Sequence, residues 1–127
     1  MNIEKILKDH QLWLKNKNTG KRANLSGADL SNMDLSGVNL SYADLSYTDL
    51  TATDLYEAVL IGVCLVGADL HHADLTSADL QNADLRNTNL SYTELSYANF
   101  NNVNLLETNL LYTDLSNVDL QNAKLTK

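Results

Sequence analysis

The sequence predicts an all-β solenoid: a right-handed quadrilateral β-helix of about five coils with an N-terminal α-helical cap. Three observations support this prediction. Leucine stands at every fifth position from Leu25 to Leu125, and Phe100 is the one exception. Proline, which would remove a backbone N–H from the pairing between coils, is absent from the chain. The segment ahead of the repeat, residues 2–17, has the apolar spacing of an amphipathic helix.

A period of five residues fits neither an α-helix nor a β-strand. In a helix, at roughly 100° per residue, the leucines would scatter around the axis, and in a strand they would alternate between the two faces. The chain therefore has to turn a corner within each pentad. Four corners close a square, and a coil of about 20 residues can stack on the next at strand spacing, roughly 4.8 Å. The chirality of L-residues favours a right-handed coil.

Each position of the pentad has its own physical role. The leucine points inward and fills the axis of the coil. The residue two places before it is small, usually Ala, Thr or Val, because the narrow square cannot hold a second large side chain on each side. The residue directly before the leucine is mostly Asp or Asn, which hydrogen-bond to nearby backbone in turns. Residues 23–127 are therefore predicted to form the β-helix, and residues 1–22 the capping helix and turn.

The N-terminal helix is predicted to cover the open edge of the first coil, because an uncovered edge invites aggregation. Residues 18–20 end this helix, and His10 lies near Trp13 as a packed residue of the cap rather than a catalyst. The opposite face is basic, which leaves a membrane-surface helix as the alternative. The apolar face has helical spacing and consists of Ile3, Ile6, Leu7, Trp13 and Leu14.

Charge is unevenly distributed along the chain, whose net charge is −7. Residues 1–22 carry six Lys or Arg against Glu4 and Asp9, a net of +4, so residues 23–127 carry −11. An acidic body repels phosphate, which argues against direct nucleic-acid binding. The chain has no apolar run of roughly 18 residues and no secretory signal, so we expect a cytoplasmic protein without membrane attachment. One cysteine excludes an internal disulfide.

The pentads resemble those of the pentapeptide repeat family. The pattern A-D-L-x-x recurs in phase through residues 23–127, as in Ala28-Asp29-Leu30-Ser31-Asn32 and Ala68-Asp69-Leu70-His71-His72. The resemblance implies a right-handed quadrilateral β-helix. It also implies two possible properties. Some members imitate the acidic surface of duplex DNA and occupy DNA gyrase, and members often dimerise through the C-terminal edge. The N-terminal helix and the segment that follows it, residues 20–25, are similar to openings common among cyanobacterial members.

A column of acids is the first candidate surface for a partner. With 20 residues per coil, carboxylates fall in line at successive levels: Asp34, Asp54, Asp74, Glu94 and Asp114. Corner formation explains these acids without any partner, because Asp at this position bonds the backbone of the turn. The alternative, which the resemblance implies, is a DNA-mimicking inhibitor or protector of DNA gyrase. The chain is short and has no dimerising module, so the corner role ranks first.

Apolar side chains interrupt the polar exterior at a second candidate surface. Val59 and Cys64 replace corner acids, and Ile61 and Val66 occupy positions that are mostly polar elsewhere. An exposed apolar patch marks an interface, although local packing explains the same residues. Two smaller groups lie nearer the C-terminus, namely Leu106 with Leu111 and a column of His72, Tyr92 and Tyr112.

The sequence shows no arrangement of residues for catalysis. Serines occupy turn positions, and His71 and His72 are adjacent, so in an extended chain they point apart. No third ligand or nucleophile is placed by spacing, and phosphate-binding and dinucleotide motifs are missing, so we expect no enzyme activity, cofactor or metal. The leading function is a non-enzymatic scaffold for an unidentified protein partner. Lys124 and Lys127 oppose strand addition at the C-terminal edge, so we expect a monomer or a weak dimer through that edge.

Overall fold

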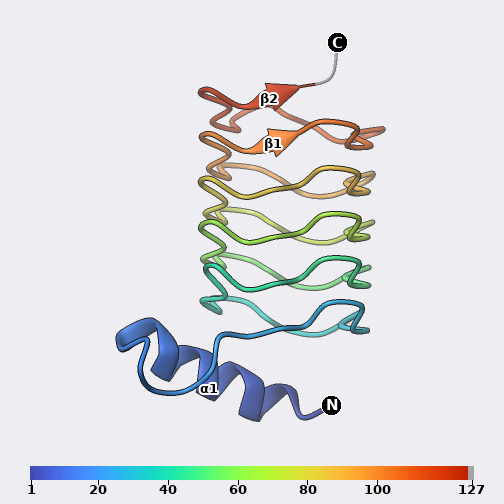
Figure 1. The fold of residues 1–127 in the computed structure, drawn as a ribbon. Helices are drawn as coiled ribbons and strands as arrows, with labels where there is room; N and C mark the ends of the chain where they lie inside the picture. Colours follow the sequence, from blue (N-terminus) through green and yellow to red (C-terminus); the bar gives the residue numbers. More distant parts are fainter. Residues whose placement is uncertain (126–127) are drawn as a thin grey trace.

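The computed structural model describes residues 1–125, and in it the helix α1 (Ile3–Lys15) lies across one end of a tall stack of coils (Figure 1). The chain then climbs the stack, each coil lying on the one before it. Two short strands near the far end, β1 (Asn104–Leu105) and β2 (Lys124–Leu125), pair in parallel. The molecule is a single column with a helix at its N-terminal end.

Parallel pairing with a constant spacing joins successive coils. Isolated bridges connect residues twenty apart, as in Asn24 with Asp44, Asp49 with Asp69, and Asp84 with Asn104. The pairing of β1 with β2 has the same spacing. Since twenty residues are four pentads, each coil has four corners. The structure thus confirms the β-helix solenoid that the leucine period predicts.

A hydrogen-bonded turn closes each corner, and its third residue has a left-handed backbone. In the first corner, the Leu25 carbonyl accepts the Ala28 N–H at 2.9 Å, and Gly27 has a φ of 73°. A type II turn requires such a positive φ, for which Gly or Asn is the usual residue. Five of the six tyrosines nevertheless occupy this position, and their rings project from the corners: Tyr42, Tyr47, Tyr92, Tyr97 and Tyr112.

Leucine fills the interior of the column. The inward leucines from Leu25 to Leu105 are buried, and so is Phe100 at the one interruption of the pattern. Small residues two places before a leucine, such as Ala58 and Ala73, are buried beside them. Burying each leucine contributes about 1.5–3 kcal/mol, which the entropy of ordering the chain opposes. The inward positions predicted from the pentad are confirmed over this range.

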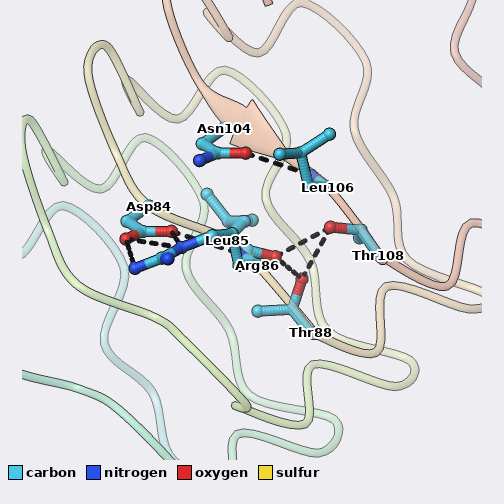
Figure 2. Close-up of polar contacts among 7 residues, drawn as sticks. All are labelled: Asp84, Leu85, Arg86, Thr88, Asn104, Leu106 and Thr108. Atoms are coloured by element: carbon cyan, nitrogen blue, oxygen red, sulfur yellow. Dashed lines mark hydrogen bonds and ion pairs between the residues drawn. The ribbon is translucent and has the colours of Figure 1, made fainter. Parts of the chain in front are cut away.

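Threonine takes the small inward position without leaving its hydroxyl unpaired. The Leu85 carbonyl accepts a hydrogen bond from Oγ1 of Thr88 at 2.7 Å, and another from Oγ1 of Thr108 on the next coil, also at 2.7 Å (Figure 2). Thr53 reaches back in the same way to the Leu30 carbonyl. The hydroxyls of Thr53 and Thr108 therefore link successive coils as well as filling space.

The helix α1 begins and ends with recognisable caps. Oδ1 of Asn2 accepts the Lys5 N–H at 3.1 Å, which satisfies one of the free donors of the first turn. Beyond the helix, Gly20 turns the chain back with a φ of 62°, and a Cβ there would collide with the Asp9 carbonyl oxygen. The helix is thus shorter at both ends than the segment 2–17 predicted from the sequence.

The apolar face of α1 is only partly used against the column. Ile3, Ile6 and Leu7 pack against the core, as their spacing predicts. Trp13 stacks instead on His10, with 5.5 Å between ring centroids, and the Lys17 ammonium lies 3.8 Å from its ring centroid. Leu14 is half-buried. The contacts that hold α1 in place therefore combine apolar packing with the bonds of His10 to the Ala23 N–H and the Ser41 carbonyl.

Candidate interaction surfaces

The predicted acidic column is regular over four levels. Parallel bridges run from Asp34 through Asp54 and Asp74 to Glu94. The described residues hold no bridge between Glu94 and Asp114, so the fifth level does not continue the ladder. On the same side, the Ser77 N–H donates to the Ser96 carbonyl, whereas the Tyr97 N–H donates to Asn117, one residue out of step. The column is therefore ordered as predicted up to Glu94 and irregular at Asp114.

Asp and Asn residues hold the backbone of the corners. Oδ1 of each accepts the N–H of the residue two places further on, at 2.8–3.2 Å, and Figure 2 shows the bond from Leu106 to Asn104. Every Asp or Asn before an inward leucine, or before Phe100, makes this bond, which accounts for these residues structurally. They are Asn24, Asp29, Asp34, Asn39, Asp44, Asp49, Asp54, Asp69, Asp74, Asp79, Asp84, Asn89, Asn99, Asn104, Asn109, Asp114 and Asp119.

Serine hydroxyls lower the pKa of several of these carboxylates. The Ser36 hydroxyl donates to Asp34 at 2.7 Å and, together with the Ser36 N–H, holds the pKa of Asp34 below its ordinary value of 3.8. The hydroxyl and N–H of Ser116 lower the pKa of Asp114 in the same way. Hydrogen bonds to the charged form favour that form. The carboxylates therefore form turns and at the same time keep a negative charge on the surface.

The predicted apolar interface is half-buried. Val59, Ile61, Cys64 and Val66 all have intermediate exposure. Tyrosines of the preceding coil cover the turns next to Ile61 and Val66, because the Tyr42 ring lies against Gly62 and the Tyr47 ring against Gly67. Local packing thus uses part of this surface, and less of it is left for a partner than the sequence predicts.

The predicted aromatic column is present in the structure. The ring centroids of His72 and Tyr92 are 5.0 Å apart and those of Tyr92 and Tyr112 are 4.9 Å apart, with interplanar angles of 26° and 19°. Tyr112, the last ring, is 76% exposed, and its neighbour Leu111 is 64% exposed. Coil stacking places these side chains at one corner because they are twenty residues apart in sequence.

His71 belongs to the same corner, and the expectation that His71 and His72 point apart was wrong. Their ring centroids are 4.0 Å apart, because both residues stand in a turn, where His72 has a φ of 62°, and not in an extended strand. His71 also meets Tyr92 edge-on at 5.4 Å, and its Nδ1 lies 2.9 Å from Oγ of Ser91. We call this surface the aromatic corner: His71, His72, Tyr92, Leu111 and Tyr112.

The C-terminal end of the column leaves apolar side chains uncovered. Leu110, Leu115 and Leu120 are half-buried, and Leu125 is 49% exposed, although leucines at the same pentad position are buried in the earlier coils. Lys124 lies in β2, whereas Lys127 lies outside the described residues. This end therefore combines an apolar interior with an exposed lysine at its rim.

Two further features are absent from residues 1–125. This stretch contains no group of three or more His, Cys, Asp or Glu side chains placed to hold a metal ion. It also contains no helix with the length and hydropathy needed to span a bilayer. Two ion pairs join residues that are close in sequence, Lys5 with Asp9 and Arg86 with Asp84, and Figure 2 shows the second.

Comparisons with known proteins agree with this architecture. A family model described as pentapeptide repeats matches residues 21–55, 53–91 and 88–126. The chain is similar to the pentapeptide repeat protein Rfr23 from the cyanobacterium Cyanothece 51142, with 24% identity, 95% of this chain and 96% of that chain covered, and a TM-score of 0.52. A pentapeptide repeat protein from Nostoc Pcc 7120 is 28% identical over 94% of this chain and 93% of that chain, with a TM-score of 0.59.

A more distant likeness concerns QnrB1, a plasmid-mediated fluoroquinolone resistance protein. It is 19% identical over 84% of this chain and 81% of that chain, with a TM-score of 0.35. No curated protein matches the chain by sequence. The family match and the two cyanobacterial structures therefore carry the comparison.

Proposed function

Since the chain belongs to the pentapeptide repeat family, a family of right-handed β-helices, we propose that it is a non-enzymatic scaffold that binds another protein through the aromatic corner. In this proposal the β-helix has about five coils, and α1 caps the first of them. The observation that carries the proposal is the exposure of Leu111 and Tyr112 beside a stacked row of rings.

The aromatic corner has the properties of a protein-binding surface. Tyrosine is enriched among the residues that dominate binding energy at interfaces, because it combines a large apolar ring with a polar tip. The rings of His72, Tyr92 and Tyr112 already lie in one stack, so they would lose little side-chain freedom when a partner binds. The backbone of this corner is held by coil-to-coil pairing, which fixes the spacing of the rings.

A matched pair of variants tests this proposal. We expect Leu111→Ser combined with Tyr112→Asn to lose a partner that wild type recovers from a lysate of the native host. The control is Tyr97→Asn, because Tyr97 is 70% exposed and occupies the same turn position at a different corner. It should recover the partner as wild type does. Equal recovery by all three proteins would reject the aromatic corner as the binding surface.

A second candidate, the DNA-mimicking inhibitor or protector of DNA gyrase, is favoured by the acidic column. Four levels of carboxylate lie in register from Asp34 to Glu94, and they form a row of negative charge along one side of the column. The same carboxylates form turns, however, so their presence requires no DNA-binding target. We therefore place this function second.

We further propose the cytoplasm as the compartment and a monomer or a weak dimer as the assembly state. With one cysteine, Cys64, the chain forms no internal disulfide, so its fold does not depend on an oxidising compartment. The exposure of Leu125 supports weak association at the C-terminal edge. Sedimentation at increasing concentration tests the assembly state, since a fixed monomer would show no concentration dependence.

A further inference from the structure

His10 is fully buried where α1 meets the column, and both of its ring nitrogens contact backbone groups. Nδ1 accepts the Ala23 N–H at 2.9 Å, and Nε2 lies 3.0 Å from the Ser41 carbonyl oxygen. A backbone N–H can only donate, so Nδ1 carries no proton, and Nε2–H donates to Ser41. The contact therefore requires a neutral imidazole.

The side chains of α1 take the place of a missing coil. Along the column, the Tyr42 N–H donates to the Ile61 carbonyl, and the Leu40 N–H donates to the Val59 carbonyl. In the first coil the equivalent carbonyls are those of Ser41 and Asn39. No coil precedes the first one, so no coil supplies N–H donors to these two carbonyls. His10 donates to the first at 3.0 Å, and Nε2 of Gln11 donates to the second at 2.9 Å. The helix thus satisfies an edge that would otherwise offer free carbonyls.

The surroundings of His10 oppose a positive charge on its ring. Burial is the main cause that lowers the pKa of His10 below its ordinary 6.5, and the charges of Arg22 and Lys17 act in the same direction. The bond to Ser41 raises it in part. The charged groups that act on the His10 ring are both cations, and Asp9, the acid beside it in sequence, pairs with Lys5 at 2.7 Å.

The opposite end of the column offers the matching edge. In the penultimate coil the N–H groups of Leu90 and Tyr92 donate to the carbonyls of Asn109 and Leu111. One coil later, the N–H groups of Leu110 and Tyr112 have no acceptor among residues 1–125. Because each coil fits on the next with the same spacing, this edge matches the edge of the first coil that α1 covers.

We propose that protonation of His10 weakens the docking of α1, and that the uncovered first coil then pairs with the C-terminal edge of a second copy, so that chains assemble head to tail. This inference rests on the capping role of α1 proposed above, and it is independent of the partner at the aromatic corner. A head-to-tail contact does not close on itself, so the assembly is open-ended. At neutral pH, α1 covers the edge of the first coil and so prevents this pairing.

Hydrogen exchange tests the first step. If only the neutral ring of His10 docks, protonation of the undocked ring, whose ordinary pKa is 6.5, weakens docking by at most about tenfold between pH 7.5 and pH 5.5. We expect the protection factors of the α1 amides and of the Ala23 N–H, corrected for intrinsic exchange, to fall over this range by up to that factor. His10→Gln should abolish the change, because its amide offers one acceptor and a donor but does not titrate.

A second variant keeps this step testable if His10→Gln fails to dock. His71→Gln combined with His72→Asn leaves His10 as the one histidine of the chain, and the loss of α1 protection should persist. Its disappearance in that variant, or unchanged protection in wild type while the His10 ring titrates, would overturn the first step.

Sedimentation velocity at pH 5.5 tests the second step. Wild type should form species larger than the monomer, whereas His10→Gln should stay monomeric. Isoelectric precipitation, a concern because the pI is about 4.6, would affect both proteins equally and would overturn the proposal. Ala123→Lys places an inward lysine at the C-terminal edge and leaves His10 unchanged. At pH 5.5 this variant should therefore lose α1 protection as wild type does, yet remain monomeric. Assembly of this variant would show that the C-terminal edge does not pair with the first coil.

Discussion

The ring of Tyr42 lies on Gly62, one coil further along the column. A Cβ on Gly62 would be 2.7 Å from both Cδ1 and Cε1 of that ring, and Gly62 itself has a φ of 64°. Tyr47 and Gly67 repeat this relationship at the next corner. Glycine serves two purposes at these corners, because it adopts the left-handed turn conformation and it leaves room for a ring.

Gly62→Ala should therefore destabilise the protein more than Gly37→Ala does. Gly37 has a φ of 67°, but a Cβ added there would meet no atom within 4 Å, so alanine costs only the left-handed conformation, roughly 1 kcal/mol. At Gly62 the Tyr42 ring must also move. Urea denaturation measures the difference, and Tyr42→Ala should remove it from the Gly62→Ala background. Equal losses at the two glycines would contradict the contact.

Leu70→Ala should create a cavity that the column cannot collapse to fill. Leu70 is fully buried, and its neighbours are held by pairing on both sides, so we expect a loss of roughly 2–5 kcal/mol in the free energy of unfolding. Ser31→Ala, at a half-buried turn position, removes the hydroxyl bond to Asp29 and should cost about 1 kcal/mol or less. Denaturant melts compare the two variants. Similar losses would refute the inward and outward assignment of the pentad.

Ser36→Ala should raise the pKa of Asp34 toward 3.8, because the Ser36 hydroxyl is the largest cause that lowers it. The sign for stability follows: the folded pKa lies below the unfolded value, so the stabilisation is present above 3.8 and is lost as the pH falls through the folded pKa. Carboxyl chemical shifts across an acid titration measure the change. The Ser36 N–H bond remains, so the return should be partial. An unchanged pKa would show that the hydroxyl is not the cause.

Replacing Asp34, Asp54, Asp74 and Asp114 together by Asn tests the gyrase alternative. The four amides keep an oxygen for the turn bonds but remove four charges, so the fold should survive while the negative field weakens. We expect neither wild type nor the variant to inhibit supercoiling by DNA gyrase strongly. Strong, salt-sensitive inhibition by wild type alone would reverse the ranking of the two functions.

Much of the fold could be predicted from the sequence, because the five-residue period determines both the geometry of the coil and the role of each position in the pentad. Leucine at every fifth position requires a corner in each pentad, and Asp or Asn before it supplies the bond that forms the corner. The inward leucines up to Leu105 and the stacked column of His72, Tyr92 and Tyr112 could therefore be predicted. Both depend on the spacing of residues along the chain, which the sequence contains.

Contacts between different elements were decided only by the tertiary structure. The paired rings of His71 and His72 depend on the turn conformation, and the partial covering of the Val59–Val66 surface depends on how Tyr42 and Tyr47 lie on two glycines of the next coil. The bonds of His10 to Ala23 and Ser41 join a helix to a coil, and no repeat relates the two. Periodicity determines which residues stack, whereas the angle at which α1 docks and the direction of each ring depend on packing in three dimensions.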